Sequence, residues 1–212
     1  PSLYDIVGGQ VALGDISDVT EEDLLGRRPI TSDEGRIRDL VAGRRVLVTG
    51  AGGSIGSELA RQLHRYGPAR LVLLDRDESA LHGVKMSLDG RALMDSDDLA
   101  LADIRDAERI KGIMLDTRPD VVFHAAALKH MPMLERAPDE AFKTNVVGTA
   151  NVLAAAIAAD VPLFVNISTD KAADPENVLG YSKRTTERLT AGSDSGEGSR
   201  YVSVRFGNVL GS

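Results

Sequence analysis

The chain has 212 residues, of which 42% are hydrophobic and 27% are charged, so it is long and apolar enough to form one domain with a sizeable core. This composition excludes a disordered chain and a collagen-like repeat. Its 25 Lys and Arg and 32 Asp and Glu give a formal net charge of −7, which argues against a protein that binds nucleic acid. Because it has no cysteine and only four histidines, none in a metal-ligand spacing, we expect neither disulfides nor a metal site.

The first 43 residues are rich in acidic side chains and show little apolar periodicity, with one short helical turn expected at residues 21–26. We predict an arm or linker over residues 1–43 and one domain over residues 44–212. The longest apolar runs, such as residues 152–159, are too short to cross a bilayer, and the N-terminal segment lacks the pattern of a secretion signal. We therefore expect a cytoplasmic protein.

From residue 44 onward, short runs rich in Val, Ile and Leu alternate with longer stretches of helical period. The predicted strands cover residues 45–49, 70–75, 99–103, 120–124, 162–168 and 201–205. The predicted helices cover residues 54–66, 78–87, 105–115, 138–159 and 177–191. Because the strands do not alternate polar and apolar residues, both of their faces are expected to be buried. This pattern predicts an α/β fold with a Rossmann-like, doubly wound parallel sheet.

A glycine-rich sequence, Thr-Gly-Ala-Gly-Gly-Ser-Ile-Gly, follows the first predicted strand directly and opens a helix. Gly50 permits a tight turn, Gly53 lets a pyrophosphate approach the backbone, and Gly56 lets the helix pack close to the strand. The backbone amides at the helix start, at Ser54 and Ile55, can then hold phosphates. The pattern predicts a dinucleotide site, and the alternative is an ordinary glycine-rich turn.

An acidic residue, Asp75, lies 19 residues beyond Gly56 at the end of the second predicted strand. A carboxylate there can accept both hydroxyls of an adenosine ribose and would repel a 2′-phosphate, which favours NAD over NADP. Arg76 leaves NADP as the less favoured alternative, because a guanidinium can stack on adenine or pair with that phosphate. Asp103 and Ile104, after the third strand, are expected to border the adenine, although Asp103 could also cap the next helix.

The predicted helix at residues 138–159 has an apolar stripe with many small side chains. We favour packing of this stripe on the helix's own sheet. The alternative is an interface between subunits, because small side chains let helices approach closely. The stripe comprises Ala141, Val146, Ala150, Leu153, Ala154 and Ile157.

Four further segments, together with the glycine turn, carry a resemblance to a known family. They are His-Ala-Ala-Ala-Leu-Lys-His at 124–130, Thr-Asn-Val-Val-Gly-Thr at 144–149, Ser-Thr-Asp-Lys at 168–171 and Arg-Phe-Gly-Asn-Val-Leu-Gly-Ser at 205–212. These segments resemble the extended short-chain dehydrogenase/reductases, and among them the CapD-like polysaccharide biosynthesis branch, the UDP-N-acetylglucosamine 4,6-dehydratases. Even residues 1–43 look like the segment before the catalytic domain in the long, membrane-anchored members of that branch.

The resemblance implies a tightly bound NAD that takes hydride from C4 of the sugar and returns it to C6 after water leaves across C5 and C6. On this basis Thr169 hydrogen-bonds the C4 oxygen, Asp170 protonates the leaving 6-hydroxyl, and Lys171 takes the C5 proton. These roles need a protonated carboxyl beside a neutral amine, which implies a dry, closed site. The alternative for the pair is a solvated loop after the fifth predicted strand.

The resemblance also places Lys183, on the next helix, among the catalytic and cofactor-binding residues, since it matches the lysine that holds the nicotinamide ribose. Most short-chain dehydrogenases carry tyrosine four residues earlier, whereas this chain has Leu179. Tyr181 cannot replace that tyrosine, because two residues of helix rotate a side chain by about 200°. The acceptor of the 4-hydroxyl proton therefore stays open. The other implied contacts are Ala125 and Ala126 to the cofactor and Lys129, His130, Asn145 and Asn208 to the substrate.

These observations favour an NAD-dependent nucleotide-sugar 4,6-dehydratase that acts on a UDP-sugar in surface polysaccharide synthesis. The alternatives are an epimerase or reductase of the same fold and a non-catalytic dinucleotide sensor. The family's smaller C-terminal lobe, which binds the nucleotide sugar, is largely absent from these 212 residues, so we expect this chain alone to be inactive. We further expect a homo-oligomer, no nucleic-acid partner, and a parent protein at the cytoplasmic face of the inner membrane.

Overall fold

The computed structural model describes most of the chain, namely residues 33–90, 96–193, 198–207 and 209. Residue contacts divide the chain into two units, 1–34 and 35–212, and the second unit holds the fold described below. The predicted helical turn at residues 21–26 lies outside the described residues. The predicted boundary at residue 43 stays a prediction, although a short helix, α3 (Glu34–Val41), precedes the first strand and buries Val41.

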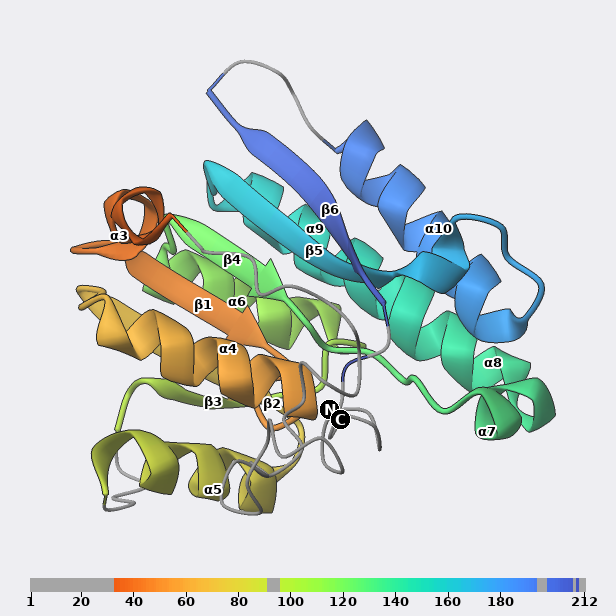
Figure 1. Ribbon diagram of the computed structural model, residues 1–212, viewed down its shortest axis with the longest axis horizontal. Helices are drawn as coiled ribbons and strands as arrows, with labels where there is room; N and C mark the ends of the chain where they lie inside the picture. Colours follow the sequence, from red (N-terminus) through yellow and green to blue (C-terminus); the bar gives the residue numbers. More distant parts are fainter. Residues whose placement is uncertain (1–32, 91–95, 194–197, 208, 210–212) are drawn as a thin grey trace, which may run out of the picture. The chain divides into compact units, whose positions relative to one another are not determined.

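Six parallel strands form one sheet in the order β3-β2-β1-β4-β5-β6 (Figure 1). The strands are β1 (Arg45–Thr49), β2 (Arg70–Asp75), β3 (Leu99–Leu101), β4 (Val121–His124), β5 (Leu163–Thr169) and β6 (Arg200–Phe206). This order places β1 at the point where successive connections turn to opposite sides of the sheet. The predicted doubly wound, Rossmann-like fold is therefore confirmed.

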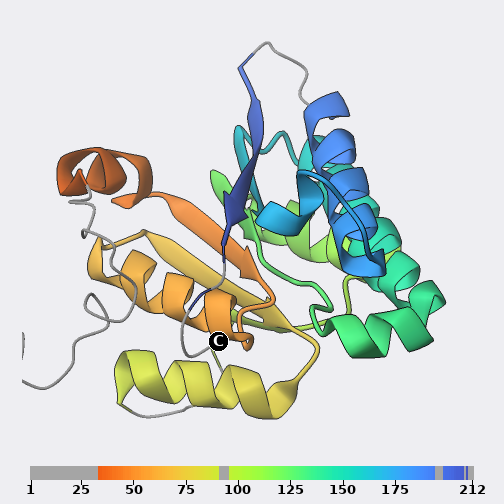
Figure 2. The ribbon, with the colours of Figure 1, turned by 45° about the vertical axis from the view of Figure 1, so that its right-hand side comes forward.

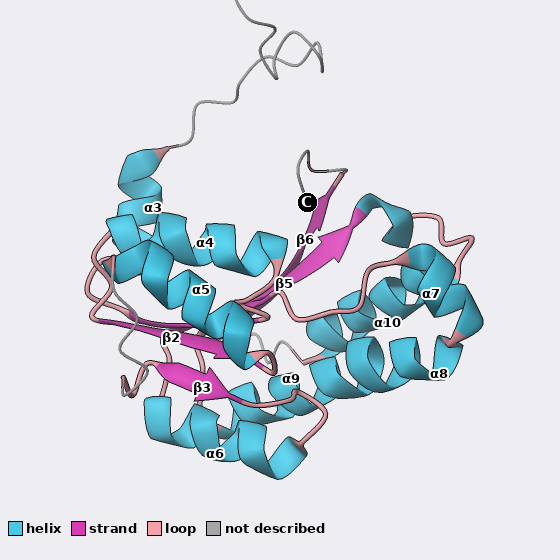
Figure 3. Ribbon diagram, turned by 90° about the horizontal axis from the view of Figure 1, so that it is seen from below, coloured by secondary structure: helices cyan, strands magenta, loops and turns pink. Residues whose placement is uncertain are grey.

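Helices cover both faces of the sheet, as Figures 2 and 3 show. Successive residues of β1 face opposite layers: Val46 and Val48 pack with α3, α4 and α5, whereas Leu47 packs with α6 and α9. The remaining helical segments are α4 (Ser54–Arg65), α5 (Glu78–Asp89), α6 (Ala107–Thr117), α7 (Met131–Arg136), α8 (Pro138–Ala141), the π-helical η2 (Phe142–Gly148), α9 (Thr149–Ala158), the 3-10 turn η3 (Asp170–Ala172) and α10 (Val178–Gly192).

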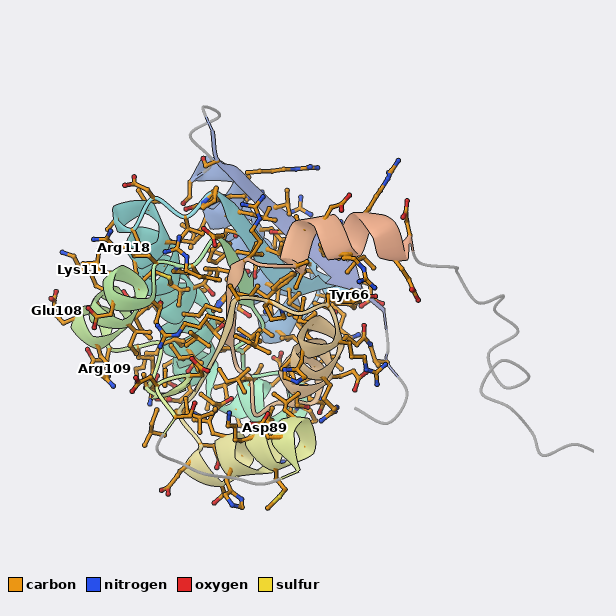
Figure 4. The ribbon with its side chains drawn as sticks, turned by 90° about the vertical axis from the view of Figure 1, so that its left-hand side faces the viewer. Tyr66, Asp89, Glu108, Arg109, Lys111 and Arg118 are labelled. Carbon is orange, nitrogen blue, oxygen red and sulfur yellow. The ribbon has the colours of Figure 1, made fainter. Side chains whose placement is uncertain are left out.

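Helix α6 shows how the sequence sets the covering layers. Ile110, Ile113 and Met114 are buried at spacings of three and four, while the charged residues Glu108, Arg109 and Lys111 are exposed. Figure 4 shows the side chains of Glu108, Arg109 and Lys111 on the outside of this helix.

The start of α6 tests the alternative in which Asp103 caps this helix. The helix begins at Ala107, two residues later than predicted, because the Asp106 carboxylate accepts a hydrogen bond from the Arg109 amide at 3.0 Å and caps the helix. The interpretation of Asp103 as the cap of this helix is therefore wrong. Asp103 instead makes its contacts at the edge of the sheet.

The predicted helix at 138–159 consists of α8, η2 and α9, and it packs on its own sheet as favoured. The predicted apolar stripe is wrong in detail, because Ala154 and Ile157 are exposed. The buried side includes the polar residues Thr144 and Asn145 of the π-helical turn and Thr149 at the start of α9. Among the described helices, this segment alone has the length and composition of a membrane span, but half of it is buried, as in a core helix.

Candidate functional site

Two adjoining clefts open at the carboxyl ends of the strands, beside the end of β1. The first has a volume of about 280 Å³ and the second about 620 Å³. They share four lining residues: Gly53, Ala125, Ala127 and Leu128. Doubly wound sheets bind their ligands at this edge, so the clefts together form the candidate site.

The glycine turn between β1 and α4 leaves no room for a Cβ at Gly50 or Gly56. Gly50 has φ +67°, and a Cβ there would lie 2.5 Å from the Ala126 amide nitrogen. A Cβ at Gly56 would collide with the Gly50 carbonyl oxygen. Gly53 caps α4 and brings no side-chain hydrogen bond to the first amides of the helix. The amides at Ser54 and Ile55, which line the second cleft, therefore suit a phosphate group.

Asp75, at the end of β2, lines the first cleft, and the backbone holds both of its carboxylate oxygens. Oδ2 accepts the Gly52 amide at 2.8 Å, and Oδ1 accepts the Asp77 amide at 3.0 Å. Each oxygen keeps a second lone pair for a ligand hydroxyl. This geometry fits the predicted ribose contact.

Asp103 and Ile104 also line the first cleft, and Asp103 sits in an ion-pair cluster. Arg105 binds both oxygens of the Asp103 carboxylate, with a shortest distance of 2.7 Å from Nη2 to Oδ2. Arg76 Nη1 lies 3.8 Å from the same Oδ2. The guanidinium of Arg105 holds the pKa of Asp103 below its usual range, so the carboxyl is ionised at neutral pH.

Thr144 is a polar residue of the first cleft that sequence reasoning did not single out. It comes from η2 and is 6% exposed, and within the described part of the chain its hydroxyl has no hydrogen-bond partner. A buried hydroxyl without a partner costs about 1–3 kcal/mol, so a polar ligand atom in the cleft would be stabilising. Its position in the motif at 144–149 was visible in the sequence, but its orientation depends on the π-helical turn.

Asn145, the next residue, lines neither cleft and is 1% exposed. Its Oδ1 accepts the Leu128 amide at 2.8 Å, and its Nδ2 donates to the Leu128 carbonyl at 3.1 Å and to Ser182 Oγ at 3.0 Å. The side chain thus holds the loop after β4 against α10. Its predicted substrate contact stays a prediction, and its observed contacts make it a positioning residue for that loop.

His124, at the end of β4, joins three elements beneath the clefts. Its Nδ1 lies 2.7 Å from Thr49 Oγ1 and its Nε2 lies 2.8 Å from Thr149 Oγ1. Complete burial, with a smaller effect of the Lys183 charge, lowers the pKa of His124 to about 3. The ring is therefore neutral at pH 7, with both nitrogens bonded to hydroxyl groups.

The second cleft is cationic. Four basic side chains line it, and none of its described lining residues is a carboxylate, although the chain carries a net charge of −7. Lys129 and His130 come from the exposed end of the loop after β4. Lys171 and Lys183 come from η3 and α10. Such a cleft attracts an anionic ligand.

Thr169, Asp170 and Lys171 lie together at the end of β5, but only Thr169 and Lys171 line the second cleft. Asp170 Oδ1 accepts hydrogen bonds from Thr169 Oγ1 at 2.9 Å and from Lys171 Nζ at 3.2 Å. The Thr169 hydroxyl and then the Lys171 ammonium hold the pKa of Asp170 below its usual range. In this arrangement the carboxyl is ionised and cannot donate a proton.

Lys183, on α10, is 7% exposed and donates from Nζ to the Ile167 carbonyl at 2.8 Å. Burial lowers the pKa of its ammonium to about 8, and Glu187 opposes part of this change. Leu179 lies on the same side and is 6% exposed, whereas Tyr181 is 59% exposed. Tyr181 therefore faces away from Lys183, as the helical spacing predicts.

Glu187 connects β5, α10 and β6 behind the second cleft. It accepts Ser168 Oγ at 2.6 Å and two bonds from the Arg205 guanidinium at 2.8 and 2.7 Å. The predicted substrate residue Asn208 follows this point of β6 but lies outside the described residues.

The comparisons with known proteins agree with this geometry. The sequence pattern of the family described as polysaccharide biosynthesis protein matches residues 46–212. The chain belongs to this family. It is 42% identical over 216 residues to the "Probable polysaccharide biosynthesis protein EpsC" of Bacillus subtilis, which covers 100% of this chain and 36% of that protein. It is 35% identical over 176 residues to the "UDP-N-acetylglucosamine 4,6-dehydratase (inverting)" of Campylobacter jejuni, which covers 80% of this chain and 50% of that protein.

A solved structure of similar fold is the UDP-glucose 4-epimerase of Stenotrophomonas maltophila with bound NAD and formylated UDP-arabinopyranose. The identity is 28% and the TM-score 0.67, over 76% of this chain and 52% of that chain. The chain is also 38% identical over 215 residues to the "Capsular polysaccharide biosynthesis protein CapD" of Staphylococcus aureus, over 100% of this chain and 36% of that protein. The predicted CapD-like branch is thereby confirmed, within the superfamily of NAD-dependent nucleotide-sugar epimerases and dehydratases. The chain spans half or less of the curated relatives it matches.

Proposed function

We propose that the protein containing this chain is an NAD-dependent nucleotide-sugar 4,6-dehydratase that acts on UDP-N-acetylglucosamine. The observation that carries the proposal is the cationic second cleft, free of carboxylates among its described lining residues, in a chain of net charge −7. A nucleotide sugar carries a diphosphate, and a cleft of this kind favours it electrostatically. The dehydratase of Campylobacter jejuni, 35% identical, supports the choice of substrate.

The first cleft and the glycine turn fit NAD. The amides at the start of α4 suit the pyrophosphate, Asp75 suits the ribose hydroxyls, and the buried Thr144 hydroxyl gains a partner. When bound, NAD supplies the site that accepts hydride from the sugar and returns it. Lys183 would hold the nicotinamide ribose from α10, where its ammonium lies at the inner end of the second cleft.

The reaction needs proton transfers that Thr169, Asp170 and Lys171 can perform only after a rearrangement. Thr169 and Lys171 are the two groups that keep Asp170 ionised. They are also the groups proposed to bind the C4 oxygen and to take the C5 proton. A sugar that engages both therefore removes the hydrogen bonds that lower the pKa of Asp170. The carboxyl can then hold the proton that the leaving 6-hydroxyl requires.

Leu179 separates this proposal from an epimerase or reductase of the same fold. Leu179 has no titratable group, yet it occupies the position of the usual tyrosine base and is buried beside the second cleft. A non-catalytic sensor would have no use for Thr169 and Lys171 at the cleft wall. The homo-oligomer stays a prediction. The cytoplasmic location and the membrane-anchored parent stay predictions.

The test is to incubate the full-length protein with UDP-N-acetylglucosamine in deuterated water and to follow the product and the sugar C5 hydrogen. We expect a 4-keto-6-deoxy product with deuterium at C5. Lys171→Ala should abolish both dehydration and C5 exchange while NADH affinity, measured by fluorescence titration, stays near that of the parent. Lys143→Ala is the matched control, because Lys143 is exposed and pairs with Asp139 and Glu140 outside both clefts.

Two outcomes would count against the proposal at different levels. A product with only the C4 hydroxyl inverted would contradict the dehydratase and favour the epimerase. Exchange at the parent rate in Lys171→Ala, with dehydration intact, would leave the dehydratase standing and remove Lys171 as the C5 base.

A further inference from the structure

Arg76 is the residue of the first cleft, among those described, that could bind a 2′-phosphate. It directly follows Asp75, lines the cleft, and has a side chain that is 51% exposed. It is the only cation among the described residues that line this cleft. Arginine is well suited to bind phosphate, so a free Arg76 would favour NADP.

The structure does not leave the Arg76 guanidinium free. Its Nη1 lies 3.8 Å from Oδ2 of Asp103, which follows the neighbouring strand β3. The two strand ends are joined by a backbone hydrogen bond of 2.9 Å from the Ala102 amide to the Asp75 carbonyl. The two side chains therefore face each other across one edge of the cleft.

The Asp103 carboxylate is itself fixed in place. Besides the side-chain bonds from Arg105, its Oδ1 accepts the Arg105 backbone amide at 2.9 Å. Arg105 is tied in turn to Glu140 of α8, with Nη1 3.2 Å from Oε2. Asp103 thus presents a fixed negative charge to Arg76. The Arg105 guanidinium is paired with two carboxylates, those of Asp103 and Glu140.

The charged side chains that line the first cleft also disfavour a 2′-phosphate. Three carboxylates, those of Asp75, Asp77 and Asp103, line it together with the single guanidinium of Arg76. A 2′-phosphate would bring further negative charge to this edge. It would also have to compete with Asp103 for Arg76.

We propose that Asp103, fixed by Arg105, is a specificity-determining residue that retains Arg76 and so excludes the 2′-phosphate of NADP. This inference rests on the proposed NAD-binding function and adds a second selector to Asp75. Asp75 rejects the phosphate directly, whereas Asp103 acts by occupying the one lining cation that could bind it.

The test is titration of NADH and NADPH into the full-length protein and its variants, freed of bound nucleotide and followed by nicotinamide fluorescence. For Asp103→Asn, which keeps the size of the side chain and removes its charge, we expect the ratio of NADPH to NADH affinity to rise about five-fold, as for loss of an exposed ion pair. Adding Arg76→Ala should cancel this rise. Arg76→Ala alone should change the ratio much less, since Arg76 is already engaged.

Glu140→Gln is the matched control, because it removes a carboxylate that pairs with Arg105 and is not paired with Arg76. An unchanged ratio in Asp103→Asn would overturn the inference, and so would an equal rise in Glu140→Gln, which would indicate a general charge effect. A rise that persists in the double variant would also overturn it, by assigning the phosphate to Arg105. Failure of the full-length parent protein to bind either dinucleotide would instead overturn the proposed function, and this inference with it.

Discussion

At the scale of single residues, we expect the Thr144 hydroxyl to find a hydrogen-bond partner when nucleotide is bound and to lack one in the nucleotide-free protein. Its buried hydroxyl lacks a partner within the described residues and lines the first cleft. We predict that Thr144→Val, which keeps the shape, raises the free energy of unfolding of the nucleotide-free protein by about 1 kcal/mol and weakens NADH binding about two- to ten-fold. Chemical denaturation and fluorescence titration measure the two effects.

Thr144→Ser keeps the hydroxyl and serves as the control for that prediction. We expect it to bind NADH much more tightly than Thr144→Val does. If Thr144→Val bound NADH as well as the parent, the hydroxyl would have no role in binding the cofactor.

His124 makes a second prediction at this scale, on stability in acid. Its pKa is about 3 in the folded protein against an ordinary value of 6.5, so between these values the unfolded chain binds the extra proton and the folded chain does not. The stability that depends on neutral His124 is complete above pH 6.5 and is lost as the pH falls toward 3, by about 1.4 kcal/mol per pH unit. We expect His124→Gln to lower stability at pH 7 but to flatten this loss.

Urea denaturation of parent and variant from pH 7 to pH 4 gives the difference in slope. His82→Gln, at an exposed position on α5, controls for the loss of a histidine. Parallel pH profiles for the parent and His124→Gln would show that His124 is not protonated on unfolding in this range.

At the scale of elements, the π-helical segment η2 holds the loop that separates the two clefts. Asn145 of η2 makes two hydrogen bonds to the backbone of Leu128 and one to Ser182. We predict that Asn145→Ala lowers the free energy of unfolding by about 2 kcal/mol, because buried groups lose their partners. Hydrogen exchange of the amides at residues 125–130 should accelerate more than that of the sheet.

Asn151→Ala is the matched control for that experiment. Asn151 also donates to backbone carbonyls, those of Ile104 and Arg105, but it does not touch the loop after β4. If its replacement accelerated exchange at residues 125–130 equally, the effect would come from the helix as a whole and not from the Asn145 contacts.

The elements that depend on local pattern were predictable from the sequence. The predicted bounds of β1 and β2 match the structure, because each is a continuous apolar run that ends at a turn or an acidic residue. Helix α7 was not predicted, because it has only six residues and carries a proline in its first turn, a short pattern that does not differ from that of a loop. The π-helical turn could not be predicted either, because its residue Asn145 is held by contacts with residues distant in sequence.

The candidate site likewise has some features that the sequence predicts and others that it does not. The glycine turn and Asp75 follow from spacing and strand ends, and both line the clefts. The pairing of Arg76 with Asp103 and the burial of the Thr144 hydroxyl depend on which side chains come together in the fold. Contacts between residues that are distant in sequence cannot be predicted from local sequence, so these features were visible only in the structure.

At the scale of the whole molecule, charge is distributed unevenly. The chain is net acidic, yet four basic residues line the second cleft. The acidic remainder of the surface repels anions in general, while the cleft attracts them. An anionic substrate is therefore directed to the place where Thr169 and Lys171 lie.

This distribution predicts how salt acts on substrate binding by the full-length protein. Lys129 is exposed at the rim of the second cleft, so its attraction for the diphosphate of the proposed substrate, UDP-N-acetylglucosamine, is open to screening. We expect Lys129→Gln to weaken binding about three-fold at low salt and to have little effect near 1 M salt, where the Debye length is about 3 Å. Calorimetric titration at several salt concentrations measures this, with Lys143→Gln as the control outside both clefts. A loss of affinity that stayed the same at every salt concentration would mean that Lys129 binds the substrate by a short, desolvated contact, and the long-range attraction of the cleft would have to come from its other basic residues.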